Sequence, residues 1–236
     1  MPRIPGLSDI EITYRRSPRT RRFSLRLSAL DGRVTLSMPA RAHLSEAQAF
    51  ARAHADWLRK ALARQPLRQG VGLGTLLPVE GTLLAIGLGS GRGVQRRDDS
   101  LLVGGDPATL APRLQAWLKT LARERLAAAS DRHAAALGRK VTQISLRDTR
   151  SRWGSCTAKG RLMYSWRLIL APPEVLDYVA AHEVAHLVQM NHSDAFWAVV
   201  ERLYPGWQHQ RDWLRGGEGQ ALHAWDFKSA RESAGD

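Results

Sequence analysis

Residues 182–192 constrain this chain more than any other segment and read His-Glu-Val-Ala-His-Leu-Val-Gln-Met-Asn-His. His182 and His186 are four positions apart, so on a helix their side chains lie about 40° from each other around the axis. Two imidazoles placed in this way can bind one metal ion, and Glu183 is close enough to hold a water molecule beside it. The segment is an H-E-x-x-H motif, which predicts a helix that carries two metal ligands and a carboxylate that takes the proton of an attacking water.

The residues around this motif favour a helix that starts at Pro172 and Pro173, because proline fits the first helical turn. An apolar stripe supports the same helix and consists of Val175, Leu176, Val179, Leu187 and Met190. Asn191 is predicted to end the helix in the left-handed conformation, and Ser193 to cap a second helix that carries Phe196.

His192 is the expected third ligand, since neutral imidazole is the commonest metal ligand in proteins. A catalytic Zn²⁺ site has three protein ligands and one open position. The alternative third ligand is a carboxylate on the following helix, either Glu201 or Asp194. The sequence therefore predicts one Zn²⁺ per chain, held by His182, His186 and a third side chain.

The composition is that of a globular protein with a real core: of 236 residues, 44% are hydrophobic and 24% are charged. No apolar run is long enough to predict a transmembrane helix, and the N-terminal residues show no secretory signal. Cys156 is the single cysteine, which excludes an intrachain disulfide framework. These features favour the cytoplasm as the location, and they leave the oligomeric state open.

The chain is strongly basic, with a formal net charge of +13. Residues 12–30 contain no acidic side chain, and they hold Arg15, Arg16, Arg19, Arg21, Arg22 and Arg26. This stretch is either a surface that contacts nucleic acid or another polyanion, or a solvated face without a partner.

Alternating apolar residues over 23–38, with Asp31-Gly32 between them, predict a β-hairpin. A helix is expected from a capping box at Ser45 and Gln48 up to Pro66, with Trp57 on its apolar face. Short strands are expected at 76–79, 83–86 and 101–103, and the glycine-rich run 87–93 reads as a hairpin loop rather than a nucleotide site.

A helical pattern covers residues 112–137 and ends at Gly138, and strands are expected at 141–146 and 162–170. The predicted fold class is α+β. Its expected parts are a β-rich N-terminal region with one helix over residues 1–105, a catalytic domain over 106–215, and a polar C-terminal tail over 216–236.

The segment Arg150-Ser-Arg-Trp-Gly-Ser-Cys156 supports two readings. Arg152 or the hydroxyl of Ser155 can contact substrate, and Arg152 can stabilise developing oxyanion charge. Alternatively, Trp153 anchors a tight turn and the arginines are solvated. Cys156 is expected to be a small buried residue rather than a nucleophile or ligand.

The chain resembles the YgjP-like metallopeptidase family, a zincin group related to SprT-like and WLM proteases. The resemblance rests on four ordered motifs: residues 150–156, Trp166-Arg-Leu-Ile-Leu-Ala-Pro-Pro173, the H-E-x-x-H segment, and Asn191-His-Ser193 followed by Phe196-Trp197. It implies a zincin-like catalytic half in which a strand borders the cleft above the metal helix. It also implies that His182, His186 and His192 are the zinc ligands and that Glu183 is the general base.

These observations favour a cytoplasmic zinc-dependent hydrolase, most simply a peptidase acting on peptides or proteins. One alternative is a metal-dependent phosphoanhydride hydrolase acting on nucleotides, because an activated water also attacks phosphorus and an arginine-rich surface suits a polyanion. A further alternative is a nucleic-acid-associated protein of the SprT-like kind, in which the zinc site acts on DNA-bound proteins or is structural.

Overall fold

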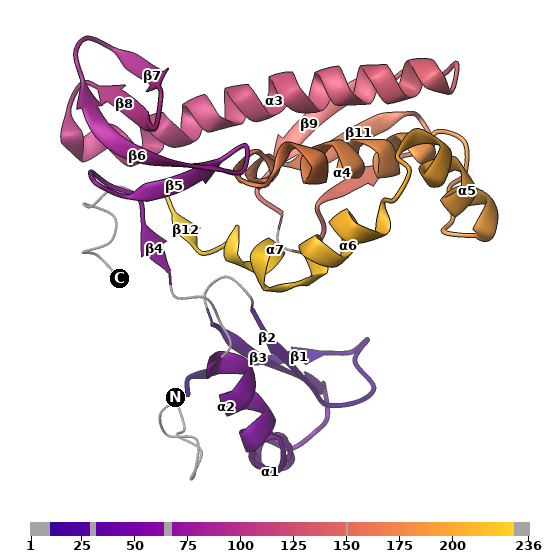
Figure 1. Cartoon of the computed structure of the whole chain (residues 1–236). Helices are drawn as coiled ribbons and strands as arrows, with labels where there is room; N and C mark the ends of the chain where they lie inside the picture. Colours follow the sequence, from indigo (N-terminus) through magenta and orange to yellow (C-terminus); the bar gives the residue numbers. More distant parts are fainter. Residues whose placement is uncertain (1–9, 29–31, 64–67, 150, 229–236) are drawn as a thin grey trace. The chain divides into compact units, whose positions relative to one another are not determined.

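The computed structural model describes residues 10–28, 32–63, 68–149 and 151–228. The chain forms two compact units, residues 1–67 and 68–236, each of which combines strands and helices (Figure 1). The predicted α+β class is therefore confirmed. None of the described helices has the length and apolar character needed to cross a membrane.

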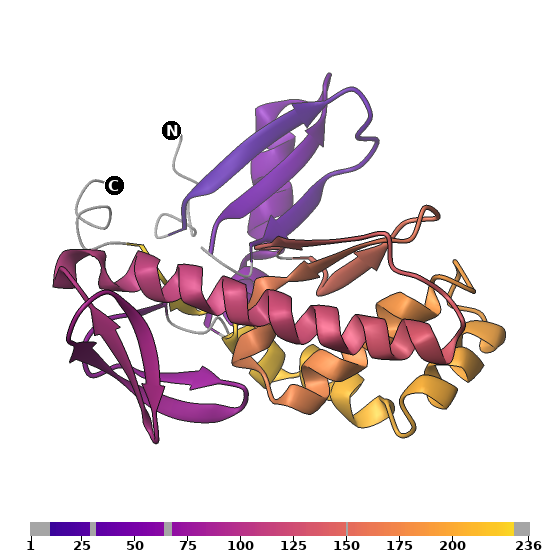
Figure 2. The same ribbon diagram turned by 90° about the horizontal axis from the view of Figure 1, so that it is seen from above.

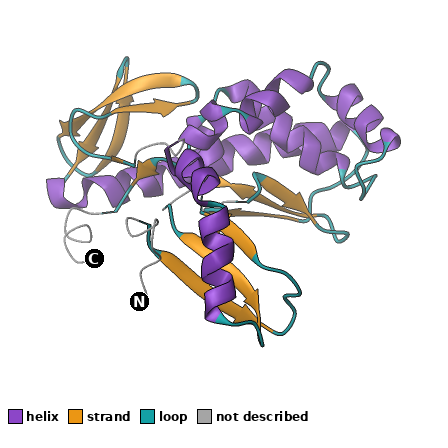
Figure 3. Ribbon diagram, turned by 90° about the horizontal axis from the view of Figure 1, so that it is seen from below, coloured by secondary structure: helices purple, strands orange, loops and turns teal. Residues whose placement is uncertain are grey.

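The first unit is a three-stranded sheet covered on one face by two helices (Figure 3). Its strands are β1 (Ile12–Ser17), β2 (Ser24–Leu27) and β3 (Val34–Pro39), in the order β1-β3-β2. β2 and β3 pair antiparallel, which confirms the hairpin, although Asp31 of its turn lies outside the described residues. β1 pairs parallel with β3. The core of this unit consists of Ile12, Val34, Leu36, Met38, Ala47, Ala51 and Leu58.

The single helix expected over residues 45–66 is instead two, α1 (Leu44–Ala53) and α2 (Ala55–Ala63). The predicted capping box at Ser45 is wrong, because the helix starts earlier and the backbone N–H of His43 donates to Glu46 Oε2 over 2.8 Å. The buried residues Ala47, Ala51 and Leu58 share one face at helical spacing, and Trp57 lies off that face. Trp57, expected on the apolar face, is therefore 48% exposed.

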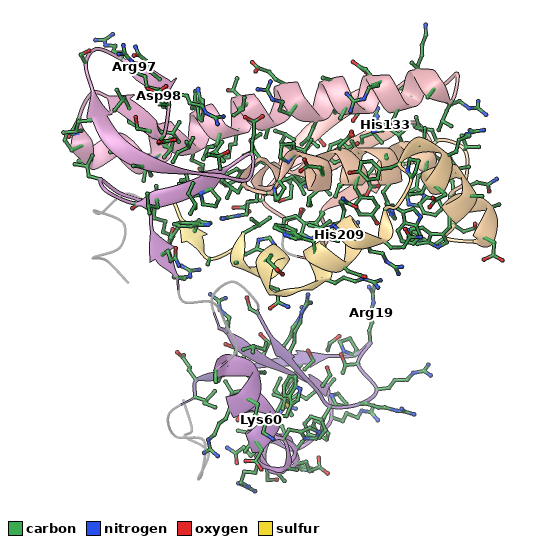
Figure 4. The ribbon with its side chains drawn as sticks, viewed as in Figure 1. Arg19, Lys60, Arg97, Asp98, His133 and His209 are labelled. Atoms are coloured by element: carbon green, nitrogen blue, oxygen red, sulfur yellow. The ribbon has the colours of Figure 1, made fainter. Side chains whose placement is uncertain are left out.

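The second unit contains a four-stranded sheet of order β5-β6-β8-β7, whose strands are β5 (Leu76–Val79), β6 (Thr82–Gly89), β7 (Gly93–Arg97) and β8 (Ser100–Gly104). β6 pairs parallel with β8, so the glycine run 87–93 does not form the expected hairpin loop between neighbouring strands. The hairpin is formed by β7 and β8, with Asp98 at φ 39° in its turn (Figure 4).

The 27-residue helix α3 (Leu110–Ala136), preceded by the short η1 (Pro107–Thr109), connects the parts of the second unit. One stripe of buried side chains runs along it and includes Leu114, Leu118, Ala122 and Leu126. The four-stranded sheet contacts one end of α3, and β9 (Gln143–Arg147) contacts it farther along (Figure 2). As predicted, the helix ends just before Gly138, whose φ of 61° suits glycine.

A second sheet of order β10-β11-β9 contains β10 (Gly154–Cys156) and β11 (Arg161–Ser165). The 3₁₀ segment η2 (Trp166–Leu170) then leads to α4 (Pro173–Ala185), which starts at the predicted prolines and packs along α3 (Figure 1). The helices α5 (Asp194–Leu203) and α6 (Gln208–Arg215) both contact α4.

The compact units divide at residue 67, whereas the sequence placed its boundary at 105. Strands β5–β8 belong with the second unit because their apolar faces share one core with α3. The described part of the expected C-terminal tail is also structured. It forms α7 (Gly217–Ala221) and β12 (Trp225–Asp226), and it buries Leu222 and Phe227. β12 pairs parallel with β4 (Gln69–Gly70).

An ionic contact fixes α4 against α3. Asp177 Oδ1 accepts hydrogen bonds from Arg132 Nη2 over 2.6 Å and from His133 Nε2 over 2.7 Å, and the imidazole of His133 is buried (Figure 4). Burial acts to raise the pKa of Asp177. The hydrogen bond and charge of His133, with the charge of Arg132, outweigh it, so this pKa lies below its ordinary value.

We expect Asp177→Asn to lower the free energy of unfolding by roughly 1–3 kcal/mol at neutral pH, because two donors lose a charged acceptor. A carboxylate whose pKa is depressed in the folded state stabilises the fold fully above its unfolded value, here 3.8, and loses this effect as pH falls through the folded pKa. The difference between wild type and variant in urea unfolding should therefore shrink below about pH 4. A difference that stays constant down to acid pH would contradict this account.

Candidate active site

Three histidines converge at the end of α4. His182 lies in its last turn, His186 is its C-terminal cap, and His192 lies in the connection to α5. Their ligand nitrogen atoms all lie within 4.8 Å of one another. A metal ion needs about three His, Cys, Asp or Glu ligands close together. Among the described residues, these three histidines form the one group of that kind.

The turn that brings His192 back starts earlier than predicted. The helix ends at Ala185, and the backbone N–H groups of Leu187 and Gln189 donate to the carbonyls of Val184 and Ala185. The left-handed residue predicted at Asn191 is wrong, since the described non-glycine residues with positive φ are Glu80 and Asp98. Ser193 does occupy the N-cap position of α5, although its side chain makes no capping bond.

One pair of donor atoms in this group has the separation that a tetrahedral ion requires. His182 Nε2 and His192 Nε2 are 3.2 Å apart. Two nitrogens bound to one Zn²⁺ at about 2.0–2.1 Å would be about 3.3 Å apart. His186 Nδ1 donates to the carbonyl of Gln189 over 2.9 Å, which leaves the lone pair on its Nε2 for a metal. Burial and the nearby His186 and His192 lower the pKa of His182 to about 3, so its imidazole stays neutral.

Phe196 packs behind all three imidazoles. Its ring centroid lies 4.9 Å from that of His182, 4.4 Å from His186 and 4.8 Å from His192. Because Phe196 is fully buried in α5, it fixes the positions of rings that come from two different segments. A residue of the apolar pattern of this second helix thus holds the three histidines together.

Glu183 lies directly beneath the strand β10. A Cβ atom added to Gly154 would lie 2.5 Å from Glu183 Oε1 and 2.6 Å from its Cγ, which is closer than side chains approach each other. Glycine at this position is therefore what allows the strand and the carboxyl group to meet. Burial raises the pKa of Glu183 to about 8, and the positive charge of Arg152 opposes this rise. A divalent cation held by the neighbouring imidazoles would oppose it further.

The strand β10 is at the edge of its sheet, with β11 as its neighbour. Hydrogen bonds from Ser165 N to Trp153 O and from Thr157 N to Arg161 O set the register of the pair. By the alternation of an antiparallel ladder, the N–H and C=O groups of Gly154 and Cys156 then point away from β11. This free edge borders the same cavity as the histidines.

The cavity has a volume of about 830 Å³, and its walls come from β10, α4, the turn after α4, α5 and α6. Three arginines line it: Arg152 from the segment before β10, and Arg211 and Arg215 from α6. The guanidinium of Arg211 lies over the rings of Trp197 and Trp207, at 4.9 and 5.3 Å from their centroids. Among the described residues, none of the three forms an ion pair, so the cavity presents free positive charge.

Sequence reasoning did not single out Arg211 and Arg215. The two are four positions apart on α6, so they share one face of that helix. That spacing is the signal that could have indicated them. Tyr178 was also overlooked; it lines the cavity from α4 with its ring edge-on to that of His182 at 6.0 Å.

The candidate substrate contacts, Arg152 and Ser155, both line the cavity. Arg152 acts on the charge of Glu183, whereas strand alternation directs the side chain of Ser155 to the face of the sheet opposite Glu183. Trp153 stacks on His223 at 4.7 Å, which gives it an anchoring role. Burial and the nearby Glu183 raise the pKa of Cys156 to about 11, so this thiol is not an activated nucleophile.

The carboxylates considered as third ligands lie outside the histidine group. Glu201 Oε1 accepts from the backbone N–H of Gly206 over 3.4 Å, near the end of α5, and Asp194 is the first residue of that helix. Neither joins the candidate metal group that the described residues form, nor does either line the cavity. The geometry thus favours His192.

Comparison with known proteins agrees with this site. A family model described as the YgjP-like metallopeptidase domain matches residues 21–216. The chain therefore belongs to the YgjP-like metallopeptidase family. A crystal structure of the metallopeptidase zymogen abylysin from Pyrococcus abyssi matches with 22% identity and a TM-score of 0.34, over 37% of this chain and 89% of that one. No curated protein sequence matches the chain.

We expect Gly154→Ala to lower the free energy of unfolding by about 1–3 kcal/mol, because its new methyl group displaces the buried Glu183 side chain. Urea unfolding measures this loss. Gly72→Ala is a matched control, since nothing lies within 4 Å of a Cβ there. Equal effects of the two substitutions would show that the close contact between Gly154 and Glu183 does not contribute to the free energy of unfolding.

Replacement of His192 by alanine should weaken zinc binding by about 100-fold or more, since losing an outer-shell partner alone costs about 10- to 100-fold. Competition with a chelator measures the affinity, and elemental analysis of wild type should give close to one zinc per chain. Glu201→Gln is the control and should leave the affinity unchanged. If it weakens zinc binding instead, with His192→Ala having no effect, the third ligand is the carboxylate.

Proposed function

We propose that this metallopeptidase hydrolyses peptide bonds with one Zn²⁺ held by His182, His186 and His192 and with Glu183 as general base. The observation that carries the proposal is the position of Glu183, between the histidine group and the free edge of β10. When bound, the ion supplies Lewis-acid chemistry, which polarises a carbonyl group and makes water a stronger acid.

The free edge of β10 fits an extended peptide. The outward N–H and C=O groups of Gly154 and Cys156 can pair with the backbone of a substrate, as an added strand pairs with a sheet edge. Such pairing would place a peptide bond above Glu183 without requiring a particular side chain. The narrow approach at Gly154 keeps that bond close to the carboxylate.

Glu183 then moves a proton. One carboxylate oxygen takes the proton from the attacking water and delivers it to the leaving amine, which completes the hydrolysis without any other base. Burial acts to raise the pKa of Glu183, and the charges of Arg152 and of a bound cation act to keep its carboxylate ionised, as a general base must be at neutral pH. Arg152 lines the cavity and its charge lowers the pKa of Glu183, which supports a role in stabilising negative charge that develops on the carbonyl oxygen.

A second candidate function is hydrolysis of a phosphoanhydride in a nucleotide. It is favoured by the three arginines of the cavity, because one guanidinium group can donate two parallel hydrogen bonds to the oxygens of one phosphate. Arg211 is held in place by two indole rings, so it could bind such an anion with little loss of side-chain freedom. The single cysteine fits a reducing compartment, and the cytoplasm remains the proposed location for either activity.

The test is hydrolysis by purified, zinc-loaded protein of casein, short fluorogenic peptides and nucleoside triphosphates, each compared with Glu183→Gln. We expect peptide hydrolysis that falls by about 100-fold or more in the variant, the scale of losing a general base. The variant keeps the size and hydrogen bonding of the side chain, so its zinc content and melting temperature should match wild type. Hydrolysis confined to nucleoside triphosphates would replace the first candidate by the second. Full activity in Glu183→Gln would rule out this base for both.

A further inference from the structure

Positive charge is concentrated in the first compact unit. Residues 1–67 hold 13 of the 35 Lys and Arg residues of the chain and only 5 of its 22 Asp and Glu residues. The histidines, the glutamate and the cavity all belong to the second unit, so the proposed chemistry does not account for this charge.

The strand register sorts these residues onto faces. Ile12, Val34, Leu36 and Leu25 point toward α1 and α2, and their sequence neighbours point to the opposite face of the sheet. The two central rows of that open face are Arg15, Ser37 and Ser24, and Thr13, Thr35 and Arg26, and the pair of Ser17 and Pro39 follows at one end. These two central rows contain four hydroxyl groups and two guanidinium groups, without an apolar or acidic side chain.

The structure also separates the arginines of the basic stretch by role. Arg16 donates from Nη1 to the carbonyls of Ala40 and Ala42 over 3.0 and 2.7 Å, so it fixes the connection that leads to α1. Arg15 and Arg26 are exposed and, within the described residues, have no carboxylate partner. Arg19, Arg21 and Arg22 lie on the β1–β2 connection next to this face, where Figure 4 labels Arg19.

We propose that the open face of the β1-β3-β2 sheet binds the phosphate backbone of nucleic acid. Arg15 and Arg26 are two strand spacings and two residues apart, which places their Cα atoms about 12 Å from each other and suits separate phosphates of one polymer. The serine and threonine hydroxyls between them can donate to phosphate oxygens, a common kind of backbone contact.

The composition of the face argues against an anionic membrane as its partner. Peripheral membrane binding combines basic residues with large apolar side chains that enter the lipid, whereas the two central rows of this face have no apolar side chain and Pro39 at its end is small. It also lacks aromatic side chains that could stack on bases, and it has no helix that could enter a groove of a duplex. Binding should thus depend on phosphates and be independent of base sequence.

The test uses the full chain and a labelled DNA duplex of mixed sequence, titrated by fluorescence anisotropy over a series of salt concentrations. Each phosphate neutralised contributes about −0.9 to the slope of log affinity against log salt. Arg15→Gln with Arg26→Gln should therefore reduce the magnitude of the slope by about 2. Circular dichroism and thermal melting should show that the fold is kept.

A charge-matched control tests whether binding requires the arginines of the open face or only the net positive charge of the chain. Arg52→Gln with Lys60→Gln removes the same number of charges from exposed positions on α1 and α2, the helices on the other face of the sheet; Figure 4 labels Lys60. This pair should leave most of the slope intact. Absence of binding by wild type at low salt would overturn the proposal, as would equal losses in the two double variants.

Vesicles of phosphatidylcholine, with and without phosphatidylserine, test whether the face binds an anionic membrane instead. We expect no binding that depends on Arg15 and Arg26. Binding to the anionic vesicles that is lost in the Arg15→Gln, Arg26→Gln variant would assign the face to membranes and contradict a nucleic-acid site. Peptidase assays are not needed for either measurement, so failure here leaves the proposed function untouched.

Discussion

Arg167 lies buried in η2, where its guanidinium joins three segments that are far apart in the sequence. Nε and Nη2 donate to the two carboxylate oxygens of Asp148 over 2.7 and 3.1 Å, and Nη1 donates to the carbonyls of Leu222 and Trp225, each over 3.0 Å. A buried charge is tolerated only when such partners replace its water. Asp148 starts the connection into β10, and the two carbonyls belong to the C-terminal segment. Arg167 thus ties the start of that connection to the C-terminal segment.

The C-terminal segment has a structural role because of this contact. His223 stacks on Trp153 in the residues that lead into β10, and Phe227 packs edge-on against Trp166 at 5.3 Å. Sequence alone suggested a polar tail, since most side chains after residue 216 are polar or small. The apolar contacts that order this segment come from a few residues, and the carbonyls that Arg167 binds carry no sequence signal at all.

The candidate metal site was largely predictable, whereas its surroundings were not. His182, Glu183 and His186 follow from helical periodicity, and the start of α4 follows from its prolines. The end of that helix did not, because a turn of backbone hydrogen bonds replaced the expected left-handed residue. The contact between Gly154 and Glu183 joins residues nearly thirty positions apart, and Arg211 reaches the cavity only through the packing of α6 on α4. Such long-range contacts depend on tertiary structure, which a local pattern does not encode.

The short free edge of β10 has a consequence for what a peptidase of this design would cut. Two outward-facing residues can pair only with a segment whose own backbone groups are unpaired, and in a native protein nearly all such groups are already satisfied. Segments in helices or interior strands could not pair with this edge, whatever their sequence. Selection would then rest on the folding state of the target, so damaged, nascent or intrinsically unstructured chains would be cleaved while intact neighbours in the same compartment survive.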